Sequence, residues 1–343
     1  MKTVNWSEEI LNQMLTTPSQ GLITDIAQIQ GDIMILGAGG KMGPDMCILA
    51  KRAAKAAGVE KKVYAVSRFS DKNAMKRLED EGVTIISADL MENGALESLP
   101  DCENIIFMAG RKFGTNGSEH LTWGMNSWLP CMTAKRFQKS NFVVFSSGNL
   151  YPKVSTASGG ATEDVKPLPV GEYPMSTLAR ERAFEYAAKE LGTRVCIMRL
   201  NYAIDLRYGV LHDICQTILA GKAVDLAAMP CFNCIWQKSA NEAAIRLLLH
   251  TSTDMNIVNV TGPETAGVKE TARQLARELG KDVTFVGEEA DTAYLNNAGQ
   301  MFSLFGYPEV SLDTLIHWQA QWILSGGRSL GKPTHFEERD GNY

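Results

Sequence analysis

A short apolar run that leads into a glycine-rich turn constrains this chain more than any other feature. Residues 33–36 (Ile-Met-Ile-Leu) indicate a buried strand of a parallel sheet. Glycines with the spacing G-x-x-G-x-x-G follow, at Gly37, Gly40 and Gly43. Pro44 then suits the first turn of a helix, where N–H groups lack intrahelical partners.

This strand, turn and helix together favour a site for a dinucleotide pyrophosphate. Glycine lets the backbone approach the phosphates, and the helix N-terminus attracts an anion. We expect Lys41 and Met42, inside the turn, to contact the same ligand. The alternative is an ordinary strand-to-helix turn, but the glycines here follow a strand and open a helix, which is the context that the nucleotide site requires.

Strands and helices alternate along most of the chain, which is typical of a parallel sheet covered on both faces. Further strands are predicted at 63–66, 83–86, 105–108, 142–145, 194–198 and 256–260. Helices are predicted at 71–81, 123–139 (with a kink at Pro130), 174–191 and 239–250, and a smaller unit follows with helices at 271–279 and 313–324 and a strand at 284–286. The fold class is therefore α/β, a Rossmann-type doubly wound parallel sheet with a smaller C-terminal α/β substrate domain.

The same pattern predicts four parts of the chain. Residues 1–30 form a helical arm, broken near Pro18, that packs on the outside of the domain or on another subunit. The dinucleotide-binding domain covers 31–202, and 232–262 return to it, whereas 203–231 and 263–330 form the substrate domain. The charged tail, 331–343, is expected to wrap a partner subunit or to be loose.

Composition narrows the partners. The chain has 343 residues and a net charge of −5, which argues against nucleic acid or an anionic membrane as the main partner. No apolar run approaches the roughly 20 residues that span a bilayer, and the N-terminus lacks a secretory apolar core. Seven scattered cysteines favour reduced thiols in the cytoplasm, and the lone C-x-x-C at 231–234 is poor evidence for a metal.

Residues at the carboxyl ends of the predicted strands are candidates for cofactor contacts, because ligands bind there in open α/β sheets. Ser67 and Arg68 follow the second strand, where a carboxylate would bind the ribose of NAD. A hydroxyl and a guanidinium suit a 2′-phosphate instead, so NADP is predicted, with NAD as the alternative. Asp89 and Leu90 follow the third strand and suit the adenine, although Asp89 could equally cap the next helix.

Further motifs occur in a fixed order along the chain: Ala88-Asp89-Leu90, Met108-Ala109-Gly110, Asn126, Ser146-Ser147-Gly148-Asn149-Leu150-Tyr151-Pro152 and Glu172-Tyr173-Pro174-Met175-Ser176-Thr177 with Glu181. With the glycine turn, this series resembles the extended short-chain dehydrogenase/reductase superfamily, its NAD-dependent epimerase/dehydratase group, over residues 31–325.

The resemblance assigns roles to several of these residues. It implies that Ser147 orients the substrate oxygen and that Tyr173 is the acid/base in hydride transfer to or from a nicotinamide. Ala109, Gly110 and Asn126 are expected to contact the cofactor. Tyr151 is expected in the wall of the site. The resemblance also implies a homo-oligomer, a dimer.

One position departs from that pattern. The family places a lysine four residues after the tyrosine, where the same helix face is reached one turn later, but this chain has Thr177. A threonine hydroxyl could bond the ribose without supplying charge, and an unperturbed tyrosine has a pKa of about 10. Three interpretations remain. Another cation, Arg180 or Lys112, supplies the positive charge near the tyrosine, or a neutral phenol acts as a slow proton donor in the reductive direction. Alternatively, the protein binds nucleotide as a regulator without turnover.

The predicted substrate is anionic. Arg111 and Lys112 follow the fourth strand and suit a carboxylate or phosphate, the alternative being a solvated basic loop. Asn201 and Arg207 follow the sixth strand, a region that relatives use for substrate. The predicted function is an NAD(P)-dependent oxidoreductase or epimerase acting on a carbohydrate hydroxyl or ketone, in a sugar acid or a nucleotide-sugar. A dehydratase, using Glu119 or Asp205, is the alternative among enzymes.

Overall fold

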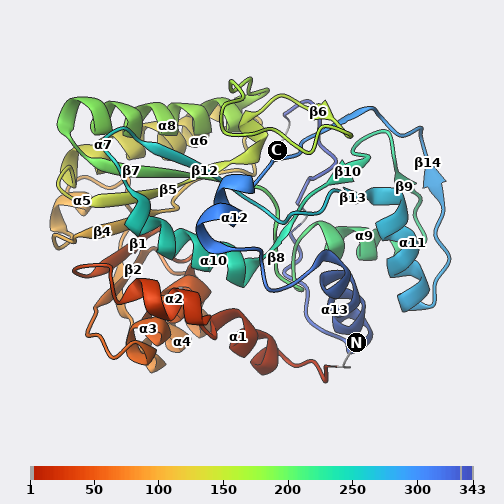
Figure 1. Ribbon diagram of the computed structural model, residues 1–343, viewed down its shortest axis with the longest axis horizontal. Coiled ribbons are helices and arrows are strands. Elements are labelled where there is room, and N and C mark those ends of the chain that lie inside the picture. Colours follow the sequence, from red (N-terminus) through yellow and green to blue (C-terminus); the bar gives the residue numbers. More distant parts are fainter. Residues whose placement is uncertain (1–3, 333, 342–343) are drawn as a thin grey trace.

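Seven parallel strands form the central sheet of the computed structural model, which describes residues 4–332 and 334–341 (Figure 1). The order across the sheet is β12-β7-β5-β4-β1-β2-β3. The strands are β1 (Ile33–Leu36), β2 (Val63–Ser67), β3 (Thr84–Ser87), β4 (Asn104–Phe107), β5 (Asn141–Ser147), β7 (Arg194–Leu200) and β12 (Asn256–Val260). All seven were expected from the sequence to within three residues at each end, and the doubly wound parallel sheet is confirmed.

The sheet reverses its winding at β1, which pairs with β2 on one side and with β4 on the other. Connections on the two sides of this point therefore cover opposite faces. In open α/β sheets the ligand crevice lies beyond the carboxyl ends of the strands at such a reversal. The glycine turn begins at Gly37, directly after β1, so the fold places this turn at the crevice.

Helices cover both faces of the sheet (Figure 1). They are α3 (Gly43–Ala56), α4 (Lys72–Asp80), α5 (Ala95–Ser98), α6 (Glu119–Trp123), α7 (Leu129–Arg136), α8 (Glu172–Leu191) and α10 (Gln237–Arg246). Ile33 and Ile35 of β1 belong to a core with α3 and α10, whereas Met34 and Leu36 belong to a core with α7 and α8. Successive side chains of a strand point to opposite faces, so one fully apolar strand supplies both cores.

The helix predicted at 123–139 has a different construction. Helical structure already begins with α6, passes through the π-helical turn η1 (Gly124–Trp128) and ends with α7. Pro130 lacks an N–H group, and its ring would clash with the carbonyl of Asn126 in a regular helix. The backbone opens into a wider turn just before the proline, where such irregularities commonly occur.

The C-terminal part surrounds a third core with short paired strands and helices. The strands are β6 (Val154–Ser155), β8 (Ala203–Ile204), β9 (Val224–Asp225), β10 (Cys231–Phe232), β11 (Ile235–Trp236), β13 (Ala266–Gly267), β14 (Phe285–Val286) and β15 (Thr292–Ala293). The helices are α9 (Val210–Leu219), α11 (Val268–Leu279) and α13 (Leu312–Leu324). The helix α12 (Gly299–Phe305) and the 3-10 turn η3 (Leu247–His250) pack instead in the core on the α3 face of the sheet, and the 3-10 turn η2 (Gly148–Leu150) directly follows β5. α9, α11 and α13 pack together around this core.

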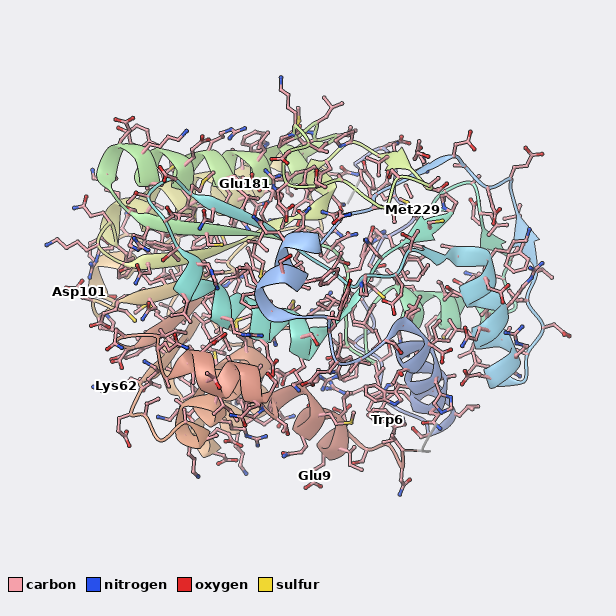
Figure 2. All side chains as sticks on the ribbon, in the orientation of Figure 1. Trp6, Glu9, Lys62, Asp101, Glu181 and Met229 are labelled. Carbon is pink, nitrogen blue, oxygen red and sulfur yellow. The ribbon has the colours of Figure 1, made fainter. Side chains whose placement is uncertain are left out.

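The N-terminal arm joins the two parts of the same chain. It consists of α1 (Glu8–Thr16) and α2 (Gln20–Ile26). Leu22 and Ile26 belong to the core on the α3 face of the sheet, whereas Leu11 and Leu15 belong to the C-terminal core. Trp6 lies beside α13, in contact with the rings of Trp318 and Trp322 (Figure 2).

The described part of the C-terminal segment packs on its own chain, which corrects the expectation of a loose tail. Thr334 and Phe336 are buried, and Phe336 contacts the ring of Phe232 in the third core. Arg339 donates hydrogen bonds to the carbonyl oxygens of Ala228 and Thr292. These partners are far away in the sequence, so no local pattern in the tail could have indicated them.

Candidate active site

Each glycine of the turn has its own steric reason. Gly37 has φ +92°, and a Cβ there would lie 2.6 Å from the backbone nitrogen of Ala109, so the ends of β1 and β4 could not approach. At Gly43 a Cβ would lie 2.3 Å from the carbonyl oxygen of Ala38, so the first turn of α3 could not close on the loop. Gly40 differs: the nearest atom to its Cβ would be the Gly37 oxygen at 3.5 Å, and its open side faces a cavity.

This cavity has a volume of about 330 Å³ and lies between the strand ends and the C-terminal part. Ten of the residues predicted for the site line it: Gly37, Gly40, Lys41, Met42, Gly110, Arg111, Lys112, Ser147, Tyr173 and Asn201. Four cationic side chains line the cavity: Lys41, Arg111, Lys112 and Arg180. None of the described lining residues is a carboxylate. The glycine turn, an open backbone and a cationic wall fit the phosphates and the nicotinamide of a dinucleotide.

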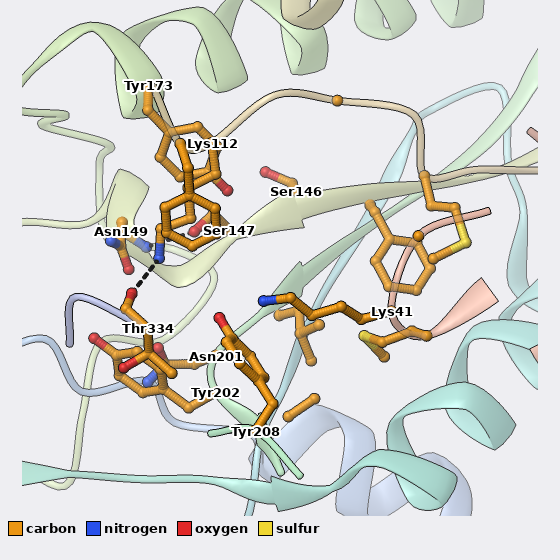
Figure 3. Close-up of a pocket in the computed structure, with 18 of the residues that line it drawn as sticks. Lys41, Lys112, Ser146, Ser147, Asn149, Tyr173, Asn201, Tyr202, Tyr208 and Thr334 are labelled. Carbon is orange, nitrogen blue, oxygen red and sulfur yellow. Dashed lines mark hydrogen bonds between the residues drawn. The ribbon is translucent and has the colours of Figure 1, made fainter. Parts of the chain in front are cut away.

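Ser147 and Tyr173 reach the cavity from different elements. Ser147 is the last residue of β5, and its Oγ accepts a hydrogen bond from the Asn149 backbone N–H at 3.2 Å. Tyr173 is the second residue of α8, which begins directly after Gly171. Figure 3 shows both side chains on the same side of the cavity, with Lys112 beside them. A hydroxyl and a phenol that converge on one space can bond one substrate oxygen.

A buried ion pair fixes the end of β5 against α8. Glu181 accepts hydrogen bonds from the Arg199 guanidinium at 2.9 and 2.7 Å and from the Ser146 hydroxyl at 2.5 Å. Arg199 also donates to the hydroxyl of Tyr151, which in turn donates to Asn259. Tyr151 is buried in this network and does not line the cavity, so its expected place in the wall is not the one that the structure gives it.

Asn126 and Arg180 hold the loop that follows β4. The Asn126 side chain accepts from the Arg111 backbone N–H and donates to the Arg111 carbonyl, each at 2.8 Å. Arg180 donates to the same Asn126 oxygen and to the carbonyl of Phe145. Burial lowers the pKa of Arg180 to about 10. Gly110 is needed here because a Cβ would lie 2.4 Å from the Arg180 guanidinium.

Two lysines face the cavity with strongly lowered pKa values. Burial, together with repulsion from Lys112 and Lys332, lowers the pKa of Lys41 to about 7. Its ammonium lies over the ring of Tyr208, 3.0 Å from the centroid. Burial lowers the pKa of Lys112 to about 8, although Glu337 and Asp213 counteract part of the effect. An anion in the cavity would stabilise the charged form of both lysines.

The structure gives Thr177 a partner within its own helix. The Thr177 hydroxyl donates to the carbonyl oxygen of Tyr173 at 2.8 Å, one turn earlier, and the residue is 1% exposed. Thr177 therefore does not line the cavity as the expected bond to a ribose would require. The cations nearest to the tyrosine come from elsewhere: the Lys112 ammonium lies 5.8 Å from the centroid of the Tyr173 ring, and Arg180 interacts electrostatically with the phenol.

Arg207, expected to contact substrate, is instead part of a buried charge network. It donates to both oxygens of Asp205, lies 3.7 Å from Asp45 at the start of α3, and donates to Glu8 of the arm. Its side chain is 7% exposed and does not line the cavity. This corrects the expectation: Arg207 joins three segments of the chain. Asp205 is occupied in the same network, and Glu119 lies on the surface, bonded to the Gly117 N–H.

The residues expected around the adenosine lie beyond the cavity, at the ends of β2 and β3. Ser67 is next to the glycine turn, because a Cβ at Gly39 would lie 2.6 Å from its hydroxyl. The Arg68 guanidinium is 3.6 Å from the Asp89 carboxylate, and its side chain is 76% exposed. Asp89 also accepts from the Met91 backbone N–H, which matches the capping alternative, and Leu90 is buried.

Several further residues line the cavity. Phe113 and Tyr202 belong to the two stretches, after β4 and after β7, that were expected to contact substrate, whereas Asn149, Tyr208 and Thr334 were not predicted. Asn149 belongs to the motif that contains Ser147, so its position there could have indicated it. Tyr208 and Thr334 come from the C-terminal part and carry no local signal. Burial raises the pKa of Tyr202 and of Tyr208, which keeps both phenols neutral.

Solved structures share this fold. The UDP-glucuronic acid 4-epimerase of Bacillus cereus, in complex with UDP-glucuronic acid and NAD, has a TM-score of 0.68 at 17% identity, covering 85% of this chain and 99% of that one. The dTDP-glucose 4,6-dehydratase of Bacillus anthracis str. Ames, in complex with NAD, has a TM-score of 0.72 at 17% identity, covering 86% and 97%. The UDP-glucose 4-epimerase of Thermotoga maritima, with UDP-glucose, has a TM-score of 0.68 at 16% identity, covering 86% and 99%.

Sequence comparison gives the family. None of the curated proteins matches the chain. The model of the NAD dependent epimerase/dehydratase family matches residues 33–204, which include β1, the glycine turn, Ser147 and Tyr173. This match confirms the predicted resemblance to extended short-chain dehydrogenases/reductases and the prediction of an enzyme of the epimerase/dehydratase type. It also supports a nicotinamide cofactor, without distinguishing NADP from NAD. The chain belongs to the NAD-dependent epimerase/dehydratase family.

Proposed function

We propose that the protein transfers a hydride between NADP and a carbohydrate-derived hydroxyl or ketone, as an oxidoreductase or epimerase. The observation that carries this proposal is that the glycine turn, Ser147 and Tyr173 line one cavity. A bound nicotinamide supplies or accepts the hydride at the substrate carbon. In the reductive direction Tyr173 donates a proton to the substrate oxygen, and in the oxidative direction it takes the proton back. Ser147 donates a hydrogen bond to the same oxygen.

Lys112 is our candidate for the cation that the family supplies from the position of Thr177. Its ammonium lies 5.8 Å from the centre of the Tyr173 ring and lines the cavity. Arg180 also lines the cavity and interacts electrostatically with the phenol, and its bonds to Phe145 and Asn126 give it a further task, which is to hold the loop after β4. A cation near the phenol stabilises the phenolate that forms when the proton leaves. We therefore assign to Arg180 the positioning of the loop after β4, and to Lys112 the positive charge that stabilises the Tyr173 phenolate.

Ser67 and Arg68 support the choice of NADP. The position after β2 carries a hydroxyl and a guanidinium rather than the carboxylate that binds a ribose 2′-hydroxyl. The exposed guanidinium can bond a 2′-phosphate with paired N–H donors. Its contact with Asp89 is a loose one at 3.6 Å, which a phosphate can replace.

The substrate in this proposal is an anionic carbohydrate, a sugar acid or a nucleotide-sugar. Four cations line the cavity without a carboxylate among the described lining residues, in a chain whose net charge is −5. Arg111 donates to the Gly114 carbonyl, which leaves other N–H groups of its guanidinium for a ligand. The side-chain nitrogen of Asn201 donates a hydrogen bond to Asn233, and its amide oxygen can accept one from a sugar hydroxyl.

A homodimer accompanies this function in our proposal. Large apolar side chains are exposed on α6, η1 and α8: Leu121, Trp123, Trp128, Met175 and Tyr186. These elements pack against each other, so the side chains belong to one region of the surface. A cluster of this kind favours a protein interface. Light scattering of the purified chain measures its mass, and a monomer would contradict the dimer.

We place the protein in the cytoplasm, where its seven cysteines would stay reduced. All seven are free thiols in the structure, and five of them are buried. None of the helices in the described part of the chain is long and apolar enough to span a bilayer. Among the described residues, no group of three or more His, Cys, Asp or Glu side chains is arranged to hold a metal ion.

The Tyr173→Phe variant tests the proposed function. We expect the turnover of NADPH with a suitable carbonyl substrate to fall about 100- to 10,000-fold, the range typical of a lost acid/base. Tyr186→Phe is the matched control, since Tyr186 is exposed on the same helix. Equal rates in the wild type and Tyr173→Phe would remove the mechanism, and binding without any turnover would favour a regulatory nucleotide-binding protein.

A further inference from the structure

The loop after β4 contacts the C-terminal segment through two pairs of consecutive residues. The Lys112 ammonium donates a hydrogen bond to the carbonyl oxygen of Thr334 at 3.3 Å. The next residue, Phe113, places the centroid of its ring 5.6 Å from that of the His335 ring. In Figure 3 the Lys112 side chain lies beside Tyr173, and its ammonium points towards Thr334. The C-terminal segment therefore forms part of the surroundings of the cation that we assign to the reaction.

Asp213 of α9 holds Thr334 in place. One oxygen of its carboxylate accepts hydrogen bonds from the Thr334 backbone N–H at 2.7 Å and from the Thr334 hydroxyl at 2.5 Å. Hydrogen bonds to a carboxylate are short and strong because the acceptor is charged. The helix α9 is itself fixed, since Leu211 and Ile214 are buried in the C-terminal core. Two links thus join this helix to the Lys112 ammonium: Asp213 to Thr334, and Thr334 to Lys112.

The Lys112 ammonium needs such a partner because of the groups around it. The charged and titratable groups near it are Lys41 of the glycine turn, Tyr173 of α8, Asp213 and Glu337. Lys41 and Lys112 repel each other, and burial lowers the pKa of Lys112 to about 8, whereas Glu337 and Asp213 attract the ammonium. An ammonium on a flexible lysine stem could turn away from Lys41, so keeping it beside the phenol requires a fixed acceptor.

We propose that Asp213 and Thr334 are positioning residues that hold the Lys112 ammonium beside Tyr173. The inference rests on the proposed function, in which Lys112 supplies the positive charge near the phenol. Thr334 contributes its carbonyl oxygen as the acceptor, and Asp213 fixes that residue by accepting from its N–H and its hydroxyl. A lysine on α8, one turn after the tyrosine, would be placed by the helix itself. Here the cation comes from a loop, so contacts with α9 and the C-terminal segment take over that task.

NMR of the full chain, isotope-labelled at the lysine Cε, tests the position of Lys112 without turnover. The centroids of the Phe113 and Tyr173 rings lie 5.3 and 5.8 Å from the ammonium, so their ring currents shift the Lys112 signal away from those of exposed lysines. Loss of the signal in Lys112→Arg assigns it. In Asp213→Ala we expect it to move into the range of the exposed lysines. Asp213→Asn should keep it in place, because an amide oxygen can still accept from both Thr334 donors.

Two further variants separate position from charge. Glu337→Gln is the matched control, because it removes the other carboxylate that attracts Lys112 and leaves the bonds between Asp213 and Thr334 in place. It should not displace the signal. Should Asp213→Ala fail to fold, Thr334→Val removes one of the two bonds with little change in size and should displace the signal in part, whereas Thr334→Ser should not.

Three NMR results would overturn the proposal. The first is a wild-type Lys112 signal among those of the exposed lysines. The second is an unchanged signal in folded Asp213→Ala, or in Thr334→Val where Asp213→Ala does not fold. The third is a displacement in Glu337→Gln as large as that in the Asp213 variant, which would assign the effect to charge alone.

Kinetics at about pH 6.5, where Lys112 is charged, test what its position does. With saturating NADPH and substrate, Asp213→Ala should lower kcat about tenfold, because the charge is present but misplaced. In the Lys112→Met background the same substitution should have no further effect, since Asp213 acts through Lys112. An unchanged kcat, or a loss that persists in Lys112→Met, would overturn the proposal. A wild type without turnover would refute the proposed function, and the NMR signal would still decide where Lys112 is held.

Discussion

The Lys112 ammonium donates a hydrogen bond to the carbonyl oxygen of Thr334, 222 residues later in the chain. One end of this bond belongs to the loop after β4 and the other to the C-terminal segment. The bond also places a cation beside Tyr173, where Thr177 supplies none. The departure from the family pattern at residue 177 and the packing of the tail are thus connected through one side chain.

Lys112→Met should lower kcat about 100-fold, because the charge that stabilises the ionised phenol is lost. Lys112→Arg should retain most of the rate. Since the pKa of Lys112 is about 8, its cation is present below pH 8 and lost above it, so kcat/KM of the wild type should fall as the pH rises through 8.

Steady-state kinetics from pH 6 to 10 measure this effect. Lys189→Met serves as the control, because Lys189 is exposed on α8 and pairs with Glu185. A Lys112→Met enzyme with the wild-type rate and the wild-type pH profile would exclude Lys112 as the cation.

Lys41 should make cofactor binding depend on pH. Its pKa is about 7 in the free protein because of burial and repulsion from Lys112, and a bound anion would raise it. The charged form binds the anion, so the dissociation constant for NADPH should rise about fivefold from pH 7 to pH 8 by linkage.

Fluorescence titration measures this constant, and Lys41→Met should remove the extra pH dependence. Lys62→Met is the control, since Lys62 lies at the amino end of β2 and is exposed (Figure 2). The same pH dependence in Lys41→Met and the wild type would contradict a role for Lys41 in binding the anion.

Arg68 should determine the choice of cofactor. Arg68→Ala should weaken NADPH binding about tenfold or more, because a hydrogen bond to a charged group is lost, and should leave NADH binding nearly unchanged. Arg182→Ala, on the exposed face of α8, is the matched control. Tighter binding of NADH than of NADPH by the wild type would overturn the assignment of NADP.

Arg207 should affect stability and not substrate affinity. Arg207→Ala removes the partner of buried Asp205 and leaves Asp45 with one cation fewer, so the free energy of unfolding should fall by about 3–5 kcal/mol. Urea denaturation measures the loss, with exposed Arg328→Ala as the reference. A stable Arg207→Ala protein with a raised KM would restore the expectation of a substrate contact.

Local patterns in the sequence were sufficient for the sheet. The apolar run 33–36 is β1 to the residue, and 256–260 is β12, because short buried strands are defined by their own side chains. The π-helical turn at η1 was not predicted. Pro130 indicates that a regular helix is disturbed but does not say whether the backbone kinks or widens. In the folded chain Asn126, within the widened turn, bonds to Arg180 and to the backbone of the loop after β4.

The site could be predicted only where it is built from strand ends and consecutive motifs. Ser147, Tyr173 and the glycines meet the cavity because parallel strands bring their carboxyl ends to one edge. Arg207 also follows a strand of the sheet, but its guanidinium is held by the carboxylates of Asp205, two residues earlier, and of Asp45 in α3. Thr334 reaches the cavity through contacts with Asp213 and Lys112, which only the folded chain reveals.

A crystal structure of the protein with NADP and a sugar acid bound tests the central claim most directly. The account predicts that the nicotinamide lies in the cavity and that the hydroxyls of Ser147 and Tyr173 are both within hydrogen-bond reach, about 2.6–3.2 Å, of one substrate oxygen. A nicotinamide outside this cavity, or a Tyr173 hydroxyl turned away from the substrate, would contradict it.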